Sequence, residues 1–440
     1  MHQILKIGQT IQIKLSGMMC KVKQFLGSGT QGEVYRASLG GKDVALKWYF
    51  PQWATNEQRT VIETLIKKGP PSRNFLWPME LVSASGVKGF GYIMPLRGKH
   101  YKSIVDLMKG RADPSFRAMA TAGFELSHSF LQLHAKGLCY RDISHNNIFF
   151  DPKTGDVLIC DNDNVAVDGT GEATIVGTPR FMAPEIVRGE ALPNTQTDLF
   201  SLPVLLFYMF MIHHPLEGRK EEEIKCFDTP AMTKIFGTEP VFIFDPDNNS
   251  NRPVPGYHDN ALAFWPIYPQ FLHNLFIKAF TDGIHDPQNG RIRESEWRSS
   301  MVRLRDSIIY CAHCGRENFY DVDALKASNG SPVSCWSCKK EIKLPPRMRI
   351  GENIIMLNYD SQVFPHHVDD QKMYDFSQPV AAVTQHPRNP NIWGLKNLSD
   401  EKWVTTCTEG TIKDVEPKRS VTLSSGTRIN FGKIEGEIRT

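Results

Sequence analysis

Strand-like and helical patterns alternate over residues 19–98 of the chain. Apolar runs bounded by glycine and polar residues predict strands at 19–25, 33–38, 43–49 and 91–96. Between the last two of these runs, Val61, Leu65 and Ile66 recur at helical spacing within residues 55–68, and a Gly-Pro-Pro turn follows. We therefore expect a small β-rich unit with one helix.

The pattern changes twice further along. Residues 103–309 have mainly helical spacing, and their longest apolar run, 199–212, contains Ser201 and Pro203. That run is too short to span a bilayer, so we interpret it as a buried helix. After residue 350, short strand-like runs are broken by Pro, Asn and Gly, and alternation around a turn at 420–432 predicts a β-hairpin in a small sandwich.

Composition narrows the class of protein. A chain of 440 residues is longer than one domain with a single hydrophobic core usually is, so we expect two or three domains. Its content of 41% hydrophobic and 22% charged residues is typical of a globular protein. A net charge of +3 does not favour nucleic-acid or membrane binding. The first residues lack the features of a secretory signal, and four of the nine cysteines form two Cys-x-x-Cys pairs, so we expect zinc in a reducing cytoplasm.

The first candidate for chemistry is a glycine-rich turn with a lysine on the next strand. Gly27, Gly29 and Gly32, with Ser28 inside the motif, form G-x-G-x-x-G, and Val34 follows. Glycines allow a hairpin backbone to approach phosphates closely and to offer N–H groups to them.

Fifteen residues after the motif, Ala45 and Lys47 lie on a predicted strand. On that strand Lys47 would face the α- and β-phosphates of a nucleotide.

Two further segments carry acidic and amide groups. Tyr140-Arg141-Asp142 precedes Asn147 by five residues, counted from Asp142, and Asp161 follows the apolar strand 157–160. A Gly-Thr-Pro-Arg-Phe-Met-Ala-Pro-Glu segment at 177–185 closes the series. In this order and spacing the motifs resemble the eukaryotic-type (bacterial Hanks-type) Ser/Thr protein kinases.

This resemblance covers residues 19–308 and implies a two-lobed kinase fold. It also implies a role for each matching residue. Asp142 would accept the proton of the substrate hydroxyl, while Asn147 and Asp161 would bind Mg²⁺ or Mn²⁺ beside ATP. Glu63 would hold Lys47, with Glu57 as the alternative.

At the adenine end of the site, the resemblance implies that Met94 is the gatekeeper. It also implies that Leu96 lies in a hinge, 95–97, whose backbone would receive adenine.

The chain departs from the family pattern at two places. Asp161-Asn162-Asp163 replaces the usual Asp-Phe-Gly, and Asp163 is the alternative metal ligand if the strand register shifts by two residues. Ser144 stands where the family has a lysine that neutralises the moving phosphoryl group. These departures leave a nucleotide-binding pseudokinase scaffold as the alternative function, and a small-molecule kinase as a third, which the 178–185 segment disfavours.

The segment before Glu185 suggests regulation. Thr178 falls where the family has its substrate-facing threonine, and Thr174 falls where activating phosphorylation is common. We expect autophosphorylation at Thr174, with Thr170 as the alternative, and Arg141 would pair with the phosphate.

The resemblance also gives two structural expectations. Arg291 should hold Glu185, and Asp198 should brace the backbone of the catalytic loop.

The cysteine pairs form a unit of their own. Cys311 and Cys314 are separated by twenty residues from Cys335 and Cys338, a spacing typical of a four-cysteine Zn²⁺ site. So small a unit has too little apolar surface to fold without the metal. We expect a structural zinc ribbon without a catalytic role.

We therefore expect an α+β protein with five parts. These are an N-terminal extension (1–18), the kinase N-lobe (19–98), the kinase C-lobe (99–308), a zinc ribbon (309–345) and an all-β sandwich (346–440). The sandwich resembles a degenerate forkhead-associated domain without its phosphothreonine-reading residues.

The Asp-Asn-Asp variant with a zinc unit is similar to bacterial kinases of tellurite-resistance contexts. That similarity implies a 2C-class phosphatase and a von Willebrand-type protein as partners, besides protein substrates.

Overall fold

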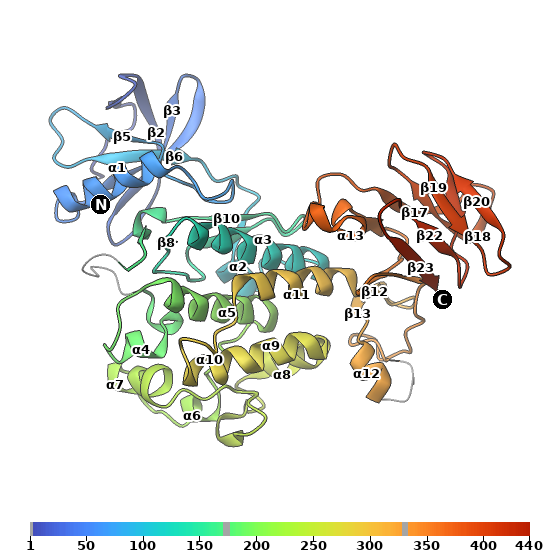
Figure 1. Cartoon of the computed structure of the whole chain (residues 1–440). Coiled ribbons are helices and arrows are strands. Elements are labelled where there is room, and N and C mark those ends of the chain that lie inside the picture. Colours follow the sequence, from blue (N-terminus) through green and yellow to red (C-terminus); the bar gives the residue numbers. More distant parts are fainter. Residues whose placement is uncertain (1–2, 170–176, 328–332) are drawn as a thin grey trace. The chain divides into compact units, whose positions relative to one another are not determined.

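The computed structural model describes residues 3–169, 177–327 and 333–440. Contacts within the chain divide it into two compact units. One comprises the chain as far as Trp265 together with Asn274–Ser299, and the other comprises Pro266–His273 and Ser300–Thr440. Figure 1 labels the elements of both units.

Six antiparallel strands of the first unit close into a barrel in the order β1-β2-β3-β4-β6-β5. They are β1 (Thr10–Ile13), β2 (Met19–Ser28), β3 (Gly32–Leu39), β4 (Lys42–Tyr49), β5 (Glu80–Ser83) and β6 (Gly91–Pro95). Alternate side chains such as Val22, Leu46 and Trp48 fill its interior. The strands predicted at 19–25, 33–38, 43–49 and 91–96 are confirmed. The pattern missed β1, which closes the barrel by pairing with both β2 and β5.

One helix, α1 (Asn56–Lys68), packs beside the barrel, as Figure 1 shows. Thr55 caps it by accepting the Gln58 N–H at 3.1 Å, and Gly69 ends it with a φ of 69° that favours glycine. Ile62 and Leu65 form its buried face. The predicted helix at 55–68 is therefore confirmed.

The rest of the first unit is mainly helical. The α-helices between residue 103 and the cysteine pairs are α2 (Ile104–Met108), α3 (Phe116–Ala135), α4 (Pro184–Val187), α5 (Thr195–Met211), α6 (Arg219–Glu222), α7 (Thr229–Thr233), α8 (Asp259–Phe264), α9 (Gln270–Phe280), α10 (Asp282–His285) and α11 (Glu294–Asp306). The division between the two units falls within α9 and within α11. Helix α5 packs against α3 and is buried from Thr197 to its end, as expected for the apolar run at 199–212. Within the described ranges, no helix is both long and apolar enough to cross a membrane.

Short two- and three-residue strands hold the loops that carry the polar motifs. β9 (Ile148–Phe150) pairs with β10 (Val157–Ile159) and with β7 (Lys102–Ser103). β8 (Leu138–Cys139) pairs with β11 (Ala166–Val167). Because both loops, 140–147 and 160–165, start and end on these strands, their side chains are brought to one place.

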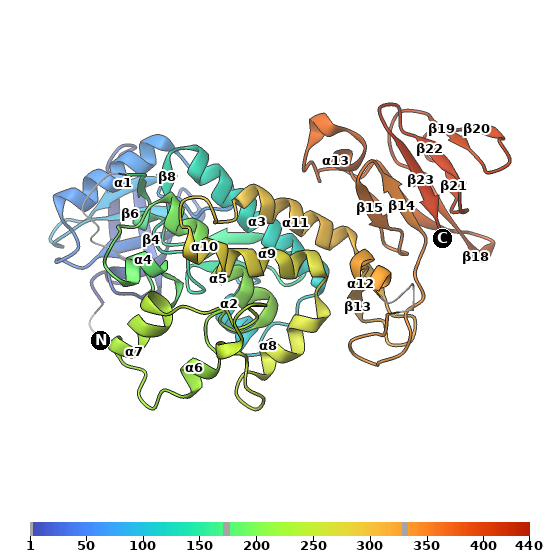
Figure 2. The same cartoon turned by 60° about the horizontal axis from the view of Figure 1, so that its bottom comes forward.

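The second unit contains a β-hairpin and two larger antiparallel sheets. The hairpin consists of β12 (Ile308–Tyr310) and β13 (Glu317–Phe319), and α12 (Val322–Ala327) follows it. The six-stranded sheet has the order β15 (Asn353–Met356), β14 (Arg347–Ile350), β23 (Glu435–Arg439), β22 (Arg428–Asn430), β19 (Trp403–Thr406), β20 (Ile412–Val415). The four-stranded sheet has the order β16 (Gln362–Val363), β17 (Ala381–His386), β18 (Asn389–Asn397), β21 (Ser420–Thr422). Figure 2 shows these strands in a second view, with α13 (Pro365–Val368) beside them.

The two sheets share one hydrophobic core, to which Met348 and Trp403 contribute from the first sheet and Val383 and Leu395 from the second. The prediction of a β-hairpin at 420–432 is wrong. β21 pairs with β18 in one sheet, whereas β22 pairs with β19 and β23 in the other, so this segment crosses between sheets.

Candidate active site

The register of the barrel brings the glycine turn and the lysine strand together. Val34 on β3 lies opposite Gly27 on β2 and Lys47 on β4. Ala45 lies opposite Met94 on β6, so the residues expected around adenine, except Leu96 just beyond the strand, occupy neighbouring strands. Lys47 projects from the face of β4 opposite to the barrel interior, because Leu46 and Trp48 take the interior positions.

The glycines of the turn differ in what they permit. A Cβ on Gly32 would lie 2.2 Å from the carbonyl oxygen of Trp48, so only glycine fits between β3 and β4 at that point. At Gly27 and Gly29 a Cβ would meet open space, and the Gly29 N–H closes the turn on the Gly32 carbonyl at 2.9 Å. The open side of the turn faces a pocket.

This pocket has a volume of about 540 Å³, within the range of small-molecule sites. It is lined by Gly27, Ser28, Gly29, Thr30, Gln31, Gly32, Val34, Lys47, Trp53, Asp142, Asp161, Asn164 and Gly177. The glycine turn, the lysine strand and the segments of Asp142, Asp161 and Gly177 thus meet in one space. The sequence motifs did not indicate that Trp53 lines the pocket, because none of them includes it.

Lys47 is enclosed by groups other than those expected. Its Nζ lies 2.8 and 3.0 Å from the two carboxylate oxygens of Asp163 and 3.5 Å from an oxygen of Asp161. Glu63 and Glu57 are both exposed and make no ion pair with Lys47. The expected pairing of Lys47 with Glu63 is therefore not found in this structure.

The two aspartates of the Asp-Asn-Asp segment differ in exposure. The side chain of Asp161 is 48% exposed and lines the pocket, while that of Asp163 is fully enclosed. Asp161 has a left-handed backbone (φ 49°), and Asn162–Asn164 follow as a short 3₁₀ turn, η1. This backbone geometry directs the carboxylate of Asp161 to the pocket and the carboxylate of Asp163 to Lys47. Asn162 is buried and donates to the Ile159 carbonyl at 2.9 Å.

Asp142 sits between a hydroxyl and an amide. Its Oδ1 accepts the hydroxyl of Thr178 at 2.7 Å, and its Oδ2 accepts the side-chain amide of Asn147 at 3.0 Å. Burial raises the pKa of the Asp142 carboxyl, although both of these donors act to lower it. The group is thus a partly desolvated carboxylate aimed at a hydroxyl.

The oxygens that a divalent cation prefers are present at the same place. The Asn147 amide nitrogen is engaged by Asp142, while its side-chain oxygen accepts no hydrogen bond from the described residues. The backbone N–H of Cys160, next to Asp161, donates to the Asn147 carbonyl at 2.8 Å. An amide oxygen beside a half-exposed carboxylate is a donor set that suits Mg²⁺ or Mn²⁺.

Asp198 on α5 braces the catalytic loop, as expected. Its buried carboxylate accepts the backbone N–H groups of Tyr140 at 2.5 Å and Arg141 at 3.0 Å. His134 lies between Asp198, at 3.1 Å, and Glu294, which contacts the other ring nitrogen. Burial lowers the pKa of His134, but hydrogen bonds to the two carboxylates outweigh it and raise the pKa to about 9.

The other structural expectation is also confirmed. One guanidinium nitrogen of Arg291, Nη2, contacts both carboxylate oxygens of Glu185, at 2.7 and 2.8 Å, and both side chains are largely buried.

Arg141 and Ser144 also lie in the catalytic loop, the first held by a backbone contact and the second buried. Arg141 has a φ of 73° and donates its Nε to the Asn164 carbonyl at 2.6 Å. Ser144 is fully buried, so its hydroxyl does not reach the pocket. Thr170 and Thr174, the candidate phosphorylation sites, lie outside the described residues.

A family model described as "Protein kinase domain" matches residues 20–264, which is more than half of the chain. The chain belongs to the protein kinase family. The matched region includes every residue that lines the pocket, and it also includes Asn147.

Several curated kinases are similar over part of their length. Protein kinase C-like 1 of Candida albicans is 38% identical over 95 residues, which cover 21% of this chain and 8% of that protein. Protein kinase C eta type of Mus musculus is 32% identical over 122 residues, which cover 27% and 17%. CBL-interacting protein kinase 29 of Oryza sativa subsp. japonica is 28% identical over 211 residues, which cover 42% and 44%. The kinase chain thus spans less than half of each relative.

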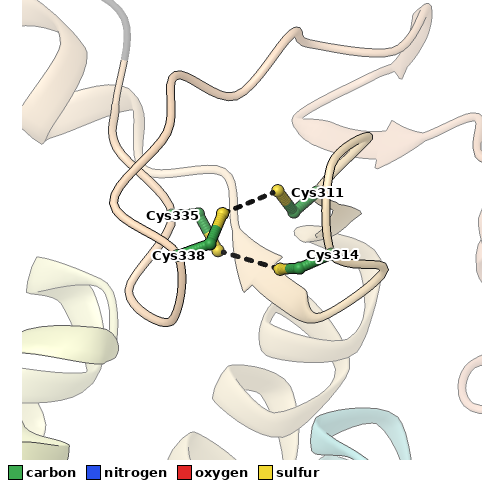
Figure 3. Close-up of side chains that lie close together, drawn as sticks. All are labelled: Cys311, Cys314, Cys335 and Cys338. Carbon is green, nitrogen blue, oxygen red and sulfur yellow. Dashed lines mark hydrogen bonds between the residues drawn. The ribbon is translucent and has the colours of Figure 1, made fainter.

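Beyond the kinase domain, the four paired cysteines converge from two loops (Figure 3). The sulfur of Cys311 lies 3.6 Å from that of Cys338, the sulfur of Cys314 lies 3.7 Å from that of Cys335, and all four lie within 4.8 Å of one another. Four thiolates about 2.3 Å from one tetrahedral Zn²⁺ would be about 3.8 Å apart. The cluster therefore fits zinc, whereas a disulfide needs sulfurs about 2 Å apart.

Each cysteine loop closes in the same way. The fifth residue, Gly315 or Lys339, has a left-handed backbone and donates its N–H to the carbonyl of the first cysteine at 2.9 Å. Asn318 links the two loops, because its side chain contacts the Cys335 sulfur and accepts the Trp336 N–H at 3.1 Å. The two loops are thus built as a matched pair that converges on one point.

Proposed function

We propose that this kinase chain transfers the γ-phosphoryl group of ATP to Ser or Thr hydroxyls of proteins. The observation that carries the proposal is the carboxylate of Asp142, which already holds a threonine hydroxyl, that of Thr178, at 2.7 Å. It does so in the pocket that also contains Lys47 and Asp161. A substrate hydroxyl placed where Thr178 now donates would be oriented for in-line attack.

Each remaining residue has a role in this proposal. The backbone of Gly27, Ser28, Gly29 and Gly32 would cover the phosphates, and Lys47 would contact the α- and β-phosphates. Val34, Ala45, Met94 and Leu96 would enclose adenine. Asn147 and Asp161 would hold the Mg²⁺ or Mn²⁺, which neutralises charge on the phosphates when bound.

The transfer itself is a substitution at phosphorus. The acceptor oxygen forms a bond to the γ-phosphorus while the bond from that phosphorus to the bridging β–γ oxygen breaks, and ADP leaves. The hydroxyl proton passes to Asp142, whose raised pKa suits it to receive a proton. Asp198 keeps this base in place by holding the two residues that precede it in the chain.

We further propose that the kinase phosphorylates itself at Thr174, or alternatively Thr170, with Arg141 as the partner of the phosphate. Mass spectrometry of the protein before and after incubation with ATP tests the site. Modification of neither threonine in an active preparation would contradict this part of the proposal.

A radiolabelled-ATP assay tests the main proposal. Wild type should incorporate label, and Asp142→Ala should lose nearly all of it while a fluorescent ATP analogue still binds. Asp113→Asn is the matched control, since Asp113 is exposed and is not among the residues that line the pocket. Equal labelling of wild type and Asp142→Ala would refute the role of Asp142.

The alternative is a pseudokinase scaffold that binds nucleotide and partners without transfer. It is favoured by one observation: Ser144 replaces a lysine and is wholly buried, so it supplies no charge to the phosphates. Nucleotide binding by wild type without any labelling would establish this alternative.

The regions outside the kinase domain suggest further roles. Cys311, Cys314, Cys335 and Cys338 would bind a structural Zn²⁺, supported by their mutual distances. The two sheets that follow would form a degenerate forkhead-associated sandwich that binds proteins or the kinase itself. A 2C-class phosphatase and a von Willebrand-type protein remain the partners implied by resemblance. The proposed cytoplasmic location rests on the paired cysteines, which suit zinc in a reducing compartment.

A further inference from the structure

The closest partner of Lys47 is the last residue of the Asp-Asn-Asp segment. Asp163 contacts Nζ with both of its oxygens, at 2.8 and 3.0 Å, and the side chains of Lys47 and Asp163 are 7% and 0% exposed. Asp161 is farther away, at 3.5 Å, and half exposed. Because a buried ammonium requires a close counter-charge, Asp163 is the residue on which the position of Lys47 depends.

Two further side chains fix Asp163. The hydroxyl of Tyr49 donates to its Oδ2 at 2.5 Å, and the Gln58 amide donates both to the Tyr49 oxygen at 3.1 Å and to the Asp163 carbonyl at 3.4 Å. Burial and the charge of Asp163 raise the pKa of Tyr49 well above its usual value, so Tyr49 remains a donor. Lys47 and Tyr49 lie two residues apart on β4 and therefore share one face of the strand.

Helix α1 contacts Tyr49 and Asp163 through the amide of Gln58 and not through a carboxylate. Gln58 lies four and seven residues before Ile62 and Leu65, so it belongs to the same inward face. Glu63 follows Gln58 by five residues and lies on the exposed side. To bring Glu63 to Lys47, α1 would have to turn by more than a quarter of a rotation and expose its two buried residues.

We propose that Asp163 is the positioning residue for Lys47 in this kinase, with Tyr49 and Gln58 holding Asp163 in place. The inference rests on the proposed function, in which Lys47 binds the nucleotide phosphates. An ammonium has three N–H donors. Two of them serve the oxygens of Asp163, and the third remains for the pocket side, where oxygens of Gln31 and Asp161 each lie 3.5 Å away in this structure. A phosphate oxygen can take that place without breaking the Lys47–Asp163 pair.

The arrangement has a consequence for control of the site. Only Asn162 separates Asp161 from Asp163. The carboxylate of Asp161, which would bind the metal, and the carboxylate of Asp163, which orients Lys47, therefore move together. A shift of η1 would displace both, whereas a rotation of α1 would act on Lys47 only through Gln58.

The first test measures Lys47 itself and needs no catalytic activity. Wild type and Asp163→Asn are treated with an amine-reactive reagent between pH 7 and 10, and modification of Lys47 is quantified by mass spectrometry. Loss of the paired charge should lower the pKa of Lys47 and increase its labelling rate at pH 8 at least threefold. Asp113→Asn, which removes an exposed carboxylate, should label at the wild-type rate.

The second test measures transfer. Asp163→Asn should lower kcat/KM for ATP at least tenfold, and Tyr49→Phe should lower it by a smaller factor because it only loosens Asp163. Tyr49→Phe also keeps the proposal testable if Asp163→Asn does not fold, and its Lys47 labelling should also rise. If wild type shows no transfer at all, the proposed function fails, while the labelling result still decides the pairing.

Three outcomes would overturn the inference. Glu63→Gln could increase Lys47 labelling while Asp163→Asn leaves it unchanged, which would return the role to α1. Asp163→Asn could weaken Mn²⁺ binding with unchanged labelling, which would assign Asp163 to the metal. Unchanged labelling in both Asp163→Asn and Tyr49→Phe would also contradict it.

Discussion

Replacing Asp198 with asparagine tests how the fold holds the catalytic loop. The carboxylate of Asp198 is 1% exposed and accepts two backbone N–H groups, those of Tyr140 and Arg141, on different oxygens. Asparagine keeps the size of the side chain but has only one acceptor oxygen. Whichever way the amide turns, one buried N–H faces an NH₂ group instead of an acceptor.

The structure sets the size of the effect. A buried donor left without its partner costs about 1–3 kcal/mol, and loss of the charge opposite His134 adds about 1 kcal/mol. The loop should therefore open more easily by about 2–4 kcal/mol. At about 1.4 kcal/mol per factor of ten, this corresponds to amide exchange faster by a factor of about 30 to about 700.

Hydrogen–deuterium exchange followed by mass spectrometry measures this directly in a peptide that contains Tyr140 and Arg141. Asp113→Asn, an exposed substitution in the same unit, should leave exchange in that peptide unchanged. The phosphoryl-transfer rate of Asp198→Asn should fall along with the protection. Exchange within threefold of wild type would refute the reasoning, because it would mean that the two N–H groups do not depend on this carboxylate.

Three other predictions concern separate parts of the chain. The pKa of His134 is raised to about 9 in the folded protein, so its protonated ring should add up to about 3 kcal/mol to the free energy of unfolding. This contribution should be complete below pH 6.5 and lost as pH rises through 9. Urea unfolding midpoints should show this slope, and His134→Gln should flatten it. Gly32→Ala should destabilise the barrel by about 1–3 kcal/mol because its Cβ meets the Trp48 carbonyl, whereas Gly29→Ala should leave the thermal midpoint within a degree or two. Cys335→Ser should reduce bound zinc, measured by elemental mass spectrometry, from about one per chain to a small fraction, and equal zinc in both proteins would count against the four-cysteine site.

The sequence alone could predict what depends on local pattern. Strand β4 follows from a short apolar run around Lys47, and the buried helix α5 follows from a long apolar run. The ion pair of Arg291 with Glu185 and the bracing role of Asp198 followed from motif resemblance, and both contacts are present.

What could not be predicted depends on partners far apart in the chain. The four residues of β1 carry little signal of their own, and their pairing of Gln12 with Ser83 spans some seventy positions. β21 and β22 look like a hairpin locally, but each finds its partners in a different sheet.

The lysine partner was missed for a related reason. Helical spacing places Gln58 and Glu63 on the same helix, but the rotation of α1 against η1 decides which of them faces inward. One signal was available: Tyr49 lies two residues after Lys47 on β4, so the two side chains share a face.

The central claim is that nucleotide phosphates bind beneath the glycine turn, beside Lys47, Asp142 and Asp161. A crystal structure with a nonhydrolysable ATP analogue and Mn²⁺ tests it most directly. We predict phosphates under Gly27–Gly32 and manganese on oxygens of Asn147 and Asp161. A nucleotide bound elsewhere, with neither Lys47 nor Asp161 near its phosphates, would contradict the account.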